Sequence, residues 1–111
     1  MLAAEFEPAE VIGRRRSPRA PVSFDARIGR GGLDRTLCRV IDLSTHGARL
    51  EIYSPLRVGS MIWLTMPQAG PVAATIMWSD DFIAGCQFKT PLDAEVYEAL
   101  VARDQSLRRT G

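Results

Sequence analysis

The chain has 111 residues, of which 46% are hydrophobic and 24% charged, and this balance is typical of one folded domain rather than of a disordered chain. The formal net charge of +1 excludes a protein whose overall charge is built for duplex DNA. The charge is nevertheless uneven, because residues 13–39 contain eight arginines and two aspartates, a local net charge of +6. A planar guanidinium group binds phosphate bidentately, so this segment is predicted to bind an anion.

Residues 1–13 mix acidic residues with alanine and proline without any period, and we expect them to form a flexible N-terminal arm. They lack the basic start and the apolar run of a signal peptide, so a cytoplasmic protein is expected. The longest uncharged stretch, residues 58–79, contains several prolines and glycines. We interpret it as two strands and a turn and expect no membrane interaction.

Alternation of apolar and polar residues predicts six short strands. The predicted strands cover about residues 22–28, 33–43, 48–52, 60–66, 72–78 and 82–88. The residues expected to face inward include Val22, Phe24, Ala26 and Ile28 in the first strand and Val72, Ala74, Ile76 and Trp78 in the fifth. Short strands separated by turns predict an antiparallel sandwich or a small barrel.

Residues 90–93 predict the start of a C-terminal helix, with Thr90 as its cap and Pro91 at its first position. The apolar stripe of this helix consists of Leu92, Val96 and Leu100, with Tyr97 and Val101 beside them. We expect the helix to pack on the barrel as a lid. A dimerisation face is the alternative.

Cys38 and Cys86 both lie within apolar runs. They are interpreted as two reduced thiols in the core, with a disulfide as the alternative. One histidine and two separated cysteines are too few ligands for a metal site, so no metal is expected.

Two groups of polar residues could carry chemistry: the arginines of residues 14–19 and the Asp-x-Ser-x-x-Gly stretch of residues 42–47. Alone, the first is typical of a solvated tail and the second of a turn in which Gly47 supplies a positive φ. His46 lies close to Asp42 and Ser44 in sequence, but three groups in one turn rarely reach relay geometry. We therefore expect no catalytic residue.

The spacing of these two groups resembles the signature of the PilZ domain family. That signature is Arg-x-x-x-Arg followed some twenty to thirty residues later by Asp/Asn-x-Ser-x-x-Gly. The matching positions in this chain are Arg15, Arg19, Asp42, Ser44 and Gly47. The resemblance covers roughly residues 14–90.

The resemblance implies an all-β fold, a six-stranded antiparallel PilZ-type β-barrel with a C-terminal α-helix. The domain would cover residues 14–108, with the barrel at about 20–89 and the helix at about 91–106. The resemblance also implies cyclic di-GMP as the ligand. No cofactor is expected.

The family's motif carries its ligand contacts onto this chain residue by residue. Arg15 and Arg19 would bind phosphate oxygens and the guanine Hoogsteen edge, and Asp42 and Ser44 would bind the other guanine face. Gly47 would keep the turn open. A basic residue just before the motif, here Arg14, favours an intercalated pair of ligands.

Trp78 is a further candidate that could stack on a guanine at the mouth of the barrel. Packing in the core is the favoured interpretation, because Trp78 continues the inward row of the fifth strand.

We therefore expect a non-enzymatic cyclic di-GMP receptor that orders its arginine loop on binding the ligand. It would signal through a protein partner, as a monomer or a homodimer. One alternative is a PilZ-fold adaptor that binds protein but no nucleotide. The other is a small barrel that binds single-stranded nucleic acid, which would need exposed aromatic residues along a basic groove. The aromatic residues fall mostly at inward-facing positions, which argues against this second alternative.

Overall fold

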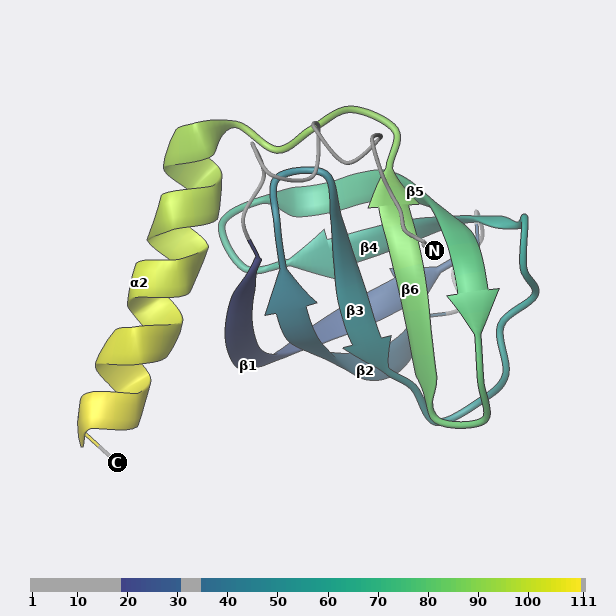
Figure 1. Cartoon of the computed structure of the whole chain (residues 1–111), viewed down its shortest axis with the longest axis horizontal. Helices are drawn as coiled ribbons and strands as arrows, with labels where there is room; N and C mark the ends of the chain where they lie inside the picture. Colours follow the sequence, from purple (N-terminus) through teal and green to yellow (C-terminus); the bar gives the residue numbers. More distant parts are fainter. Residues whose placement is uncertain (1–18, 31–34, 111) are drawn as a thin grey trace, which may run out of the picture.

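The structure is a computed structural model that describes residues 19–30 and 35–110, with side chains described as far as Asp104. The predicted arm at residues 1–13 and the candidate residues Arg14 and Arg15 lie outside the described residues. In the described part, six strands form a closed barrel in the order β1-β2-β3-β6-β5-β4, and all neighbours are antiparallel (Figure 1). The strands are β1 (Ala20–Gly29), β2 (Arg35–Leu43), β3 (Gly47–Glu51), β4 (Met61–Met66), β5 (Gly70–Ser79) and β6 (Ile83–Phe88). A six-stranded antiparallel barrel with one C-terminal helix, as predicted, is confirmed.

Alternation of side chains between the two faces of each strand fills the barrel. In β1 the four residues predicted to face inward are all buried: Val22, Phe24, Ala26 and Ile28. The other strands add further apolar side chains to the same core, including Val40, Leu50, Leu64 and Ile76. The interior is therefore a packed core, and a polar ligand must bind on the outside.

Two register shifts change which residues face outward. One lies between Val40 and Asp42 on β2 and the other between Ile76 and Trp78 on β5. An extra residue in one strand moves the alternation by one position, so that the following side chain changes face. Trp78 is consequently 45% exposed, and the prediction that it continues the buried row of β5 is wrong.

The helix α2 (Ala94–Thr110) begins three residues later than the predicted start at residue 91. Its cap is Asp93, whose Oδ1 accepts the N–H of Glu95 at 2.9 Å. The residues just before α2 are held by the barrel, because the N–H of Leu92 donates to the carbonyl of Thr45 at 2.7 Å. The segment predicted as the first helical turn is therefore a linker that is fastened to the barrel.

The helix lies beside the start of β1 (Figure 1). Leu100 is fully buried against the core, and Val96, Tyr97 and Val101 are packed on it. Asp104 is also buried, and its Oδ1 accepts the N–H of Ser23 at 2.9 Å. The apolar stripe thus packs on the barrel. Among the described residues, no helix has the length and apolarity needed to cross a membrane.

Both cysteines are free and buried, in agreement with the interpretation as reduced thiols. Burial raises the pKa of each thiol to about 12, with nearby negative charge adding to the effect at Cys38. Because these folded-state pKa values lie above the ordinary value of 9.0, the neutral thiols contribute stability below about pH 9. That contribution is lost as the pH rises from about 9 towards 12.

We predict that iodoacetamide leaves Cys38 and Cys86 unmodified in the native protein at about pH 8, because neither thiolate is populated or exposed. Both thiols should react after unfolding in urea. Mass spectrometry of the alkylated protein with and without urea measures this. Native-state alkylation at the rate of a free thiol would contradict it.

Candidate functional site

The signature turn, residues 44–47, joins β2 to β3 and is held by the side chain of its first residue. The hydroxyl oxygen of Ser44 accepts the N–H groups of His46 at 3.1 Å and of Gly47 at 3.2 Å. The N–H of Ser44 donates to the carbonyl of Gly47 at 2.9 Å. Since the Ser44 side chain is buried and its oxygen already accepts two bonds, this residue shapes the turn from inside.

Gly47 is required by a close approach of two strands. A Cβ atom at this position would overlap the carbonyl oxygen of Cys86 on β6. The expectation that Gly47 supplies a positive φ is wrong, since among the described glycines only Gly59 and Gly70 have one. The absence of a side chain lets β3 begin directly against β6, and this fixes the position of the turn.

Arg19 and Asp42, the two halves of the predicted motif, meet on the outer surface of the barrel. Nη1 of Arg19 lies 3.6 Å from Oδ2 of Asp42, and their side chains are 63% and 18% exposed. A second guanidinium group approaches the same oxygen, with Nη2 of Arg49 at 3.9 Å. One carboxylate therefore lies between two cations on an open face.

Arg49 is a candidate that reasoning from the sequence missed. Its Nε is buried and has no hydrogen-bond partner among the described residues. The sequence could have indicated Arg49 as a surface residue, because it lies two residues after Gly47 at a position of β3 that faces outward. Its proximity to Asp42 depends on strand register, which the sequence did not provide.

The register aligns four residues in one row across the outer face. Asp42 on β2 is opposite Arg49 on β3, Arg49 is opposite Gly85 on β6, and Gly85 is opposite Trp78 on β5. A Cβ atom on Gly85 would overlap the indole of Trp78, so the ring lies across this glycine. With strands about 4.8 Å apart, the row spans roughly 14 Å. We call these four residues, together with Arg19, the outer strip.

One side of the outer strip is close to α2. Burial raises the pKa of Tyr97, and the charges of Asp42 and Glu98 raise it further. Asp42 is opposite Pro21 on β1, and α2 is joined to the same strand by the bond between Ser23 and Asp104. The helix lies next to the acidic end of the strip, and Trp78 lies at the other end.

The expectation that aromatic residues mostly face inward is wrong. Phe24 and Phe88 are buried, whereas Tyr53, Trp63, Trp78 and Phe82 are exposed. Of these four, Trp78 lies in the outer strip. Trp78, the one aromatic residue proposed from the sequence for ligand stacking, therefore lies on the same face as Asp42.

We predict that Gly47→Ala destabilises the protein by about 1–3 kcal/mol, because β3 must move away from the Cys86 carbonyl. Urea denaturation followed by circular dichroism gives the free energy of unfolding. A loss below about 0.5 kcal/mol, the range of ordinary surface substitutions, would contradict the close-approach explanation.

Comparison with known protein families matches the PilZ domain to residues 13–103. A comparison with curated proteins returned no match. The family match spans most of the chain and includes both halves of the motif, the barrel and the first part of α2. The chain therefore belongs to the PilZ domain family.

Proposed function

We propose that this chain is a receptor for cyclic di-GMP that binds the dinucleotide along the outer strip and catalyses no reaction. PilZ domains typically bind this ligand and are generally non-catalytic. The observation that carries the proposal is the convergence of Arg19 and Arg49 on the Asp42 carboxylate. These three groups match the hydrogen-bonding edges of guanine and the charge of phosphate.

Guanine presents the acceptors N7 and O6 on one edge, which suit an arginine fork. Its other edge presents N–H donors, which suit the carboxylate of Asp42. Arg19 would bind the Hoogsteen edge or a phosphate, and the exposed part of the Arg49 guanidinium would donate to a second acceptor of the same ligand. The proposal includes Arg15 as a phosphate contact and Arg14 as the residue that favours two intercalated ligands.

The ion pair between Arg19 and Asp42 is suited to exchange partners. An exposed pair contributes only about 0–1 kcal/mol to stability, and Arg19 is largely exposed. A hydrogen bond to a charged group contributes about 1.5–3 kcal/mol. Replacing the ion pair by contacts to guanine and phosphate is therefore favourable, and the fold does not depend on the pair.

Trp78 would cover one base of the ligand at the far end of the outer strip. Its indole is exposed, and Gly85 leaves no side chain between the ring and Arg49. Stacking of a base on an aromatic ring contributes about 1–3 kcal/mol. Ser44 and Gly47 would act indirectly, by holding the turn that presents Asp42.

The proposal also includes a signalling step. Residues 14–18 directly precede Arg19, so contacts of Arg14 and Arg15 to the ligand would order this loop against the barrel. The surface that results would be read by a protein partner.

Calorimetric titration with cyclic di-GMP tests the site. Arg19→Ala and Asp42→Ala should each weaken binding at least about tenfold, because each removes a hydrogen bond between a charged group and the ligand. The pair of Arg39 and Asp25 is a matched control, since it has the same 3.6 Å separation on the outer face. Arg39→Ala and Asp25→Ala should bind as the parent does. Equal losses in both pairs, or no saturable binding by the parent, would contradict the proposal.

A second titration separates stacking at Trp78 from general attraction to exposed rings. Trp78→Ala should weaken binding of cyclic di-GMP about tenfold or more. Tyr53→Ala should leave it unchanged, because Tyr53 is similarly exposed but follows the end of β3 and lies outside the outer strip. If instead single-stranded oligonucleotides bound tightly and both substitutions weakened them, the chain would be a nucleic-acid-binding barrel.

A further inference from the structure

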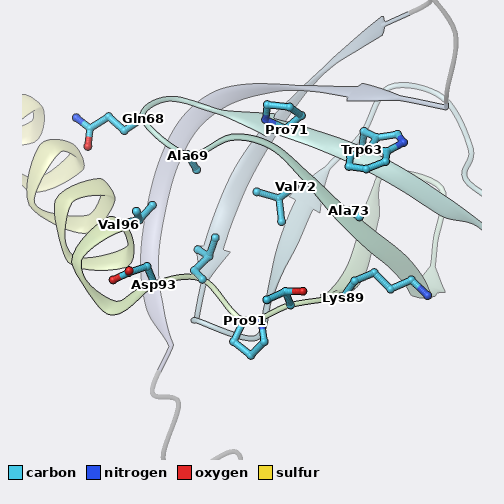
Figure 2. Close-up of a pocket in the computed structure, with 12 residues that line it drawn as sticks. Trp63, Gln68, Ala69, Pro71, Val72, Ala73, Lys89, Pro91, Asp93 and Val96 are labelled. Atoms are coloured by element: carbon cyan, nitrogen blue, oxygen red, sulfur yellow. The ribbon is translucent and has the colours of Figure 1, made fainter.

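A second surface lies at the same end of the barrel as the signature turn but outside the outer strip. It is a groove of about 410 Å³ between the β4–β5 hairpin, the linker of residues 89–93 and the first turns of α2. Figure 2 shows Trp63 and Lys89 at one end of this groove and Gln68, Asp93 and Val96 at the other. Among the residues that the structure describes, neither Arg19 nor Asp42 lines it.

The lining of the groove favours an apolar side chain next to a carboxylate. Most of the lining is apolar, with Pro71 and Val72 along the hairpin and the exposed ring of Trp63 at one end. Lys89, the only lysine of the chain, lies at the same end of the groove as Trp63. The acidic group at the other end, Asp93, is already engaged as the cap of α2.

The linker that forms one wall of the groove is bonded to the signature turn. The N–H of Leu92 donates to the carbonyl of Thr45 at 2.7 Å, and the N–H of Phe88 donates to the carbonyl of His46 at 2.8 Å. On the other side, the N–H of Lys89 donates to the carbonyl of Ala73 at 2.9 Å. The groove and the turn that presents Asp42 are therefore parts of one hydrogen-bonded unit.

We propose that this groove binds the chain's own residues 5–7, Glu-Phe-Glu. Phe6 would fill the apolar part, and a neighbouring carboxylate would lie beside Lys89. The charge is complementary, because residues 1–13 contain three glutamates and no lysine or arginine. An apolar side chain between two carboxylates matches both features of the groove.

The described chain starts close enough for this contact. Ala20 pairs with Leu43, next to the signature turn, so Arg19 lies at the end of the barrel where the linker is bonded. The thirteen residues from Phe6 to Arg19 can span up to about 43 Å. The longest dimension of the molecule is 38 Å, so the length of the segment is sufficient.

The consequence for regulation rests on the proposed function. Only residues 8–13 separate this segment from residues 14–19, so drawing Arg14 and Arg15 onto cyclic di-GMP would pull residues 5–7 out of the groove. Ligand binding and occupancy of the groove would then oppose each other, and the vacated groove would become the surface that a partner reads.

A zero-length carbodiimide cross-link in the full chain tests the contact. The reagent joins an amine to a carboxylate only where the two touch, and Lys89 supplies the only lysine ε-amine. Peptide mass spectrometry of the monomer should find Lys89 joined to Glu5 or Glu7 without any ligand. Phe6→Ala should lower the yield about tenfold, because the apolar anchor is lost. Phe82→Ala, which removes an exposed phenylalanine at the β5–β6 turn, is the matched control and should leave the yield unchanged.

Three results would overturn the proposal. These are Lys89 joined only to carboxylates of the barrel or α2, a product formed only between two copies, and an unchanged yield in Phe6→Ala. Lys89→Arg keeps the charge and should abolish the product, which confirms its assignment. Because the yield is measured without ligand, it decides the contact even if calorimetry finds no binding of cyclic di-GMP. If the ligand binds, it should lower the yield, and an unchanged yield would refute the opposition between the two sites.

Discussion

The signature turn is the junction on which the arrangement of the site depends. Ser44 closes the turn with its hydroxyl, and Gly47 brings β3 against the carbonyl of Cys86. The carbonyls inside the turn accept the N–H groups of Phe88 and Leu92, which fasten the end of β6 and the linker to α2. One short turn thus joins β2, β3, β6 and α2, and Asp42 is placed just before it. Ser44 and Gly47, two residues of the family motif, would therefore affect ligand binding only by holding this turn in place.

The same strands provide both the core and the outer strip. On β2, Leu43 is fully buried and its neighbour Asp42 faces outward, and on β3 the same holds for Leu50 and Arg49. The inward residues form the core that holds the barrel together. The outward residues can therefore exchange their ion-pair partners for a ligand without loss of the fold. An exposed ion pair contributes little to stability, which makes it a suitable resting state for groups that later bind an anionic ligand. The arginine-rich segment of the chain leads directly into the outer strip, so the excess positive charge lies next to the proposed binding site of the anionic ligand.

Local alternation was sufficient to predict the strands, and the buried face of β1 followed from it residue by residue. The motif spacing was sufficient to predict that Arg19 and Asp42 meet. What the sequence could not provide depends on tertiary register: the bulge that turns Trp78 outward, the alignment of Arg49 with Asp42, and the strand contact that requires Gly47. The late start of α2 also coincides with a tertiary contact, the long-range bond from the N–H of Leu92 to the carbonyl of Thr45.

The most direct measurement of the central claim is a titration of the isotopically labelled full chain with cyclic di-GMP, followed by backbone and indole NMR signals. The account predicts saturable shifts at Asp42, Arg49 and Gly85 and at the indole N–H of Trp78, which together trace one row across β2, β3, β6 and β5. Signals of the control pairing between Asp25 on β1 and Arg39 on β2 should stay in place. Shifts confined to that pairing, or no saturable shifts at millimolar ligand, would contradict the account.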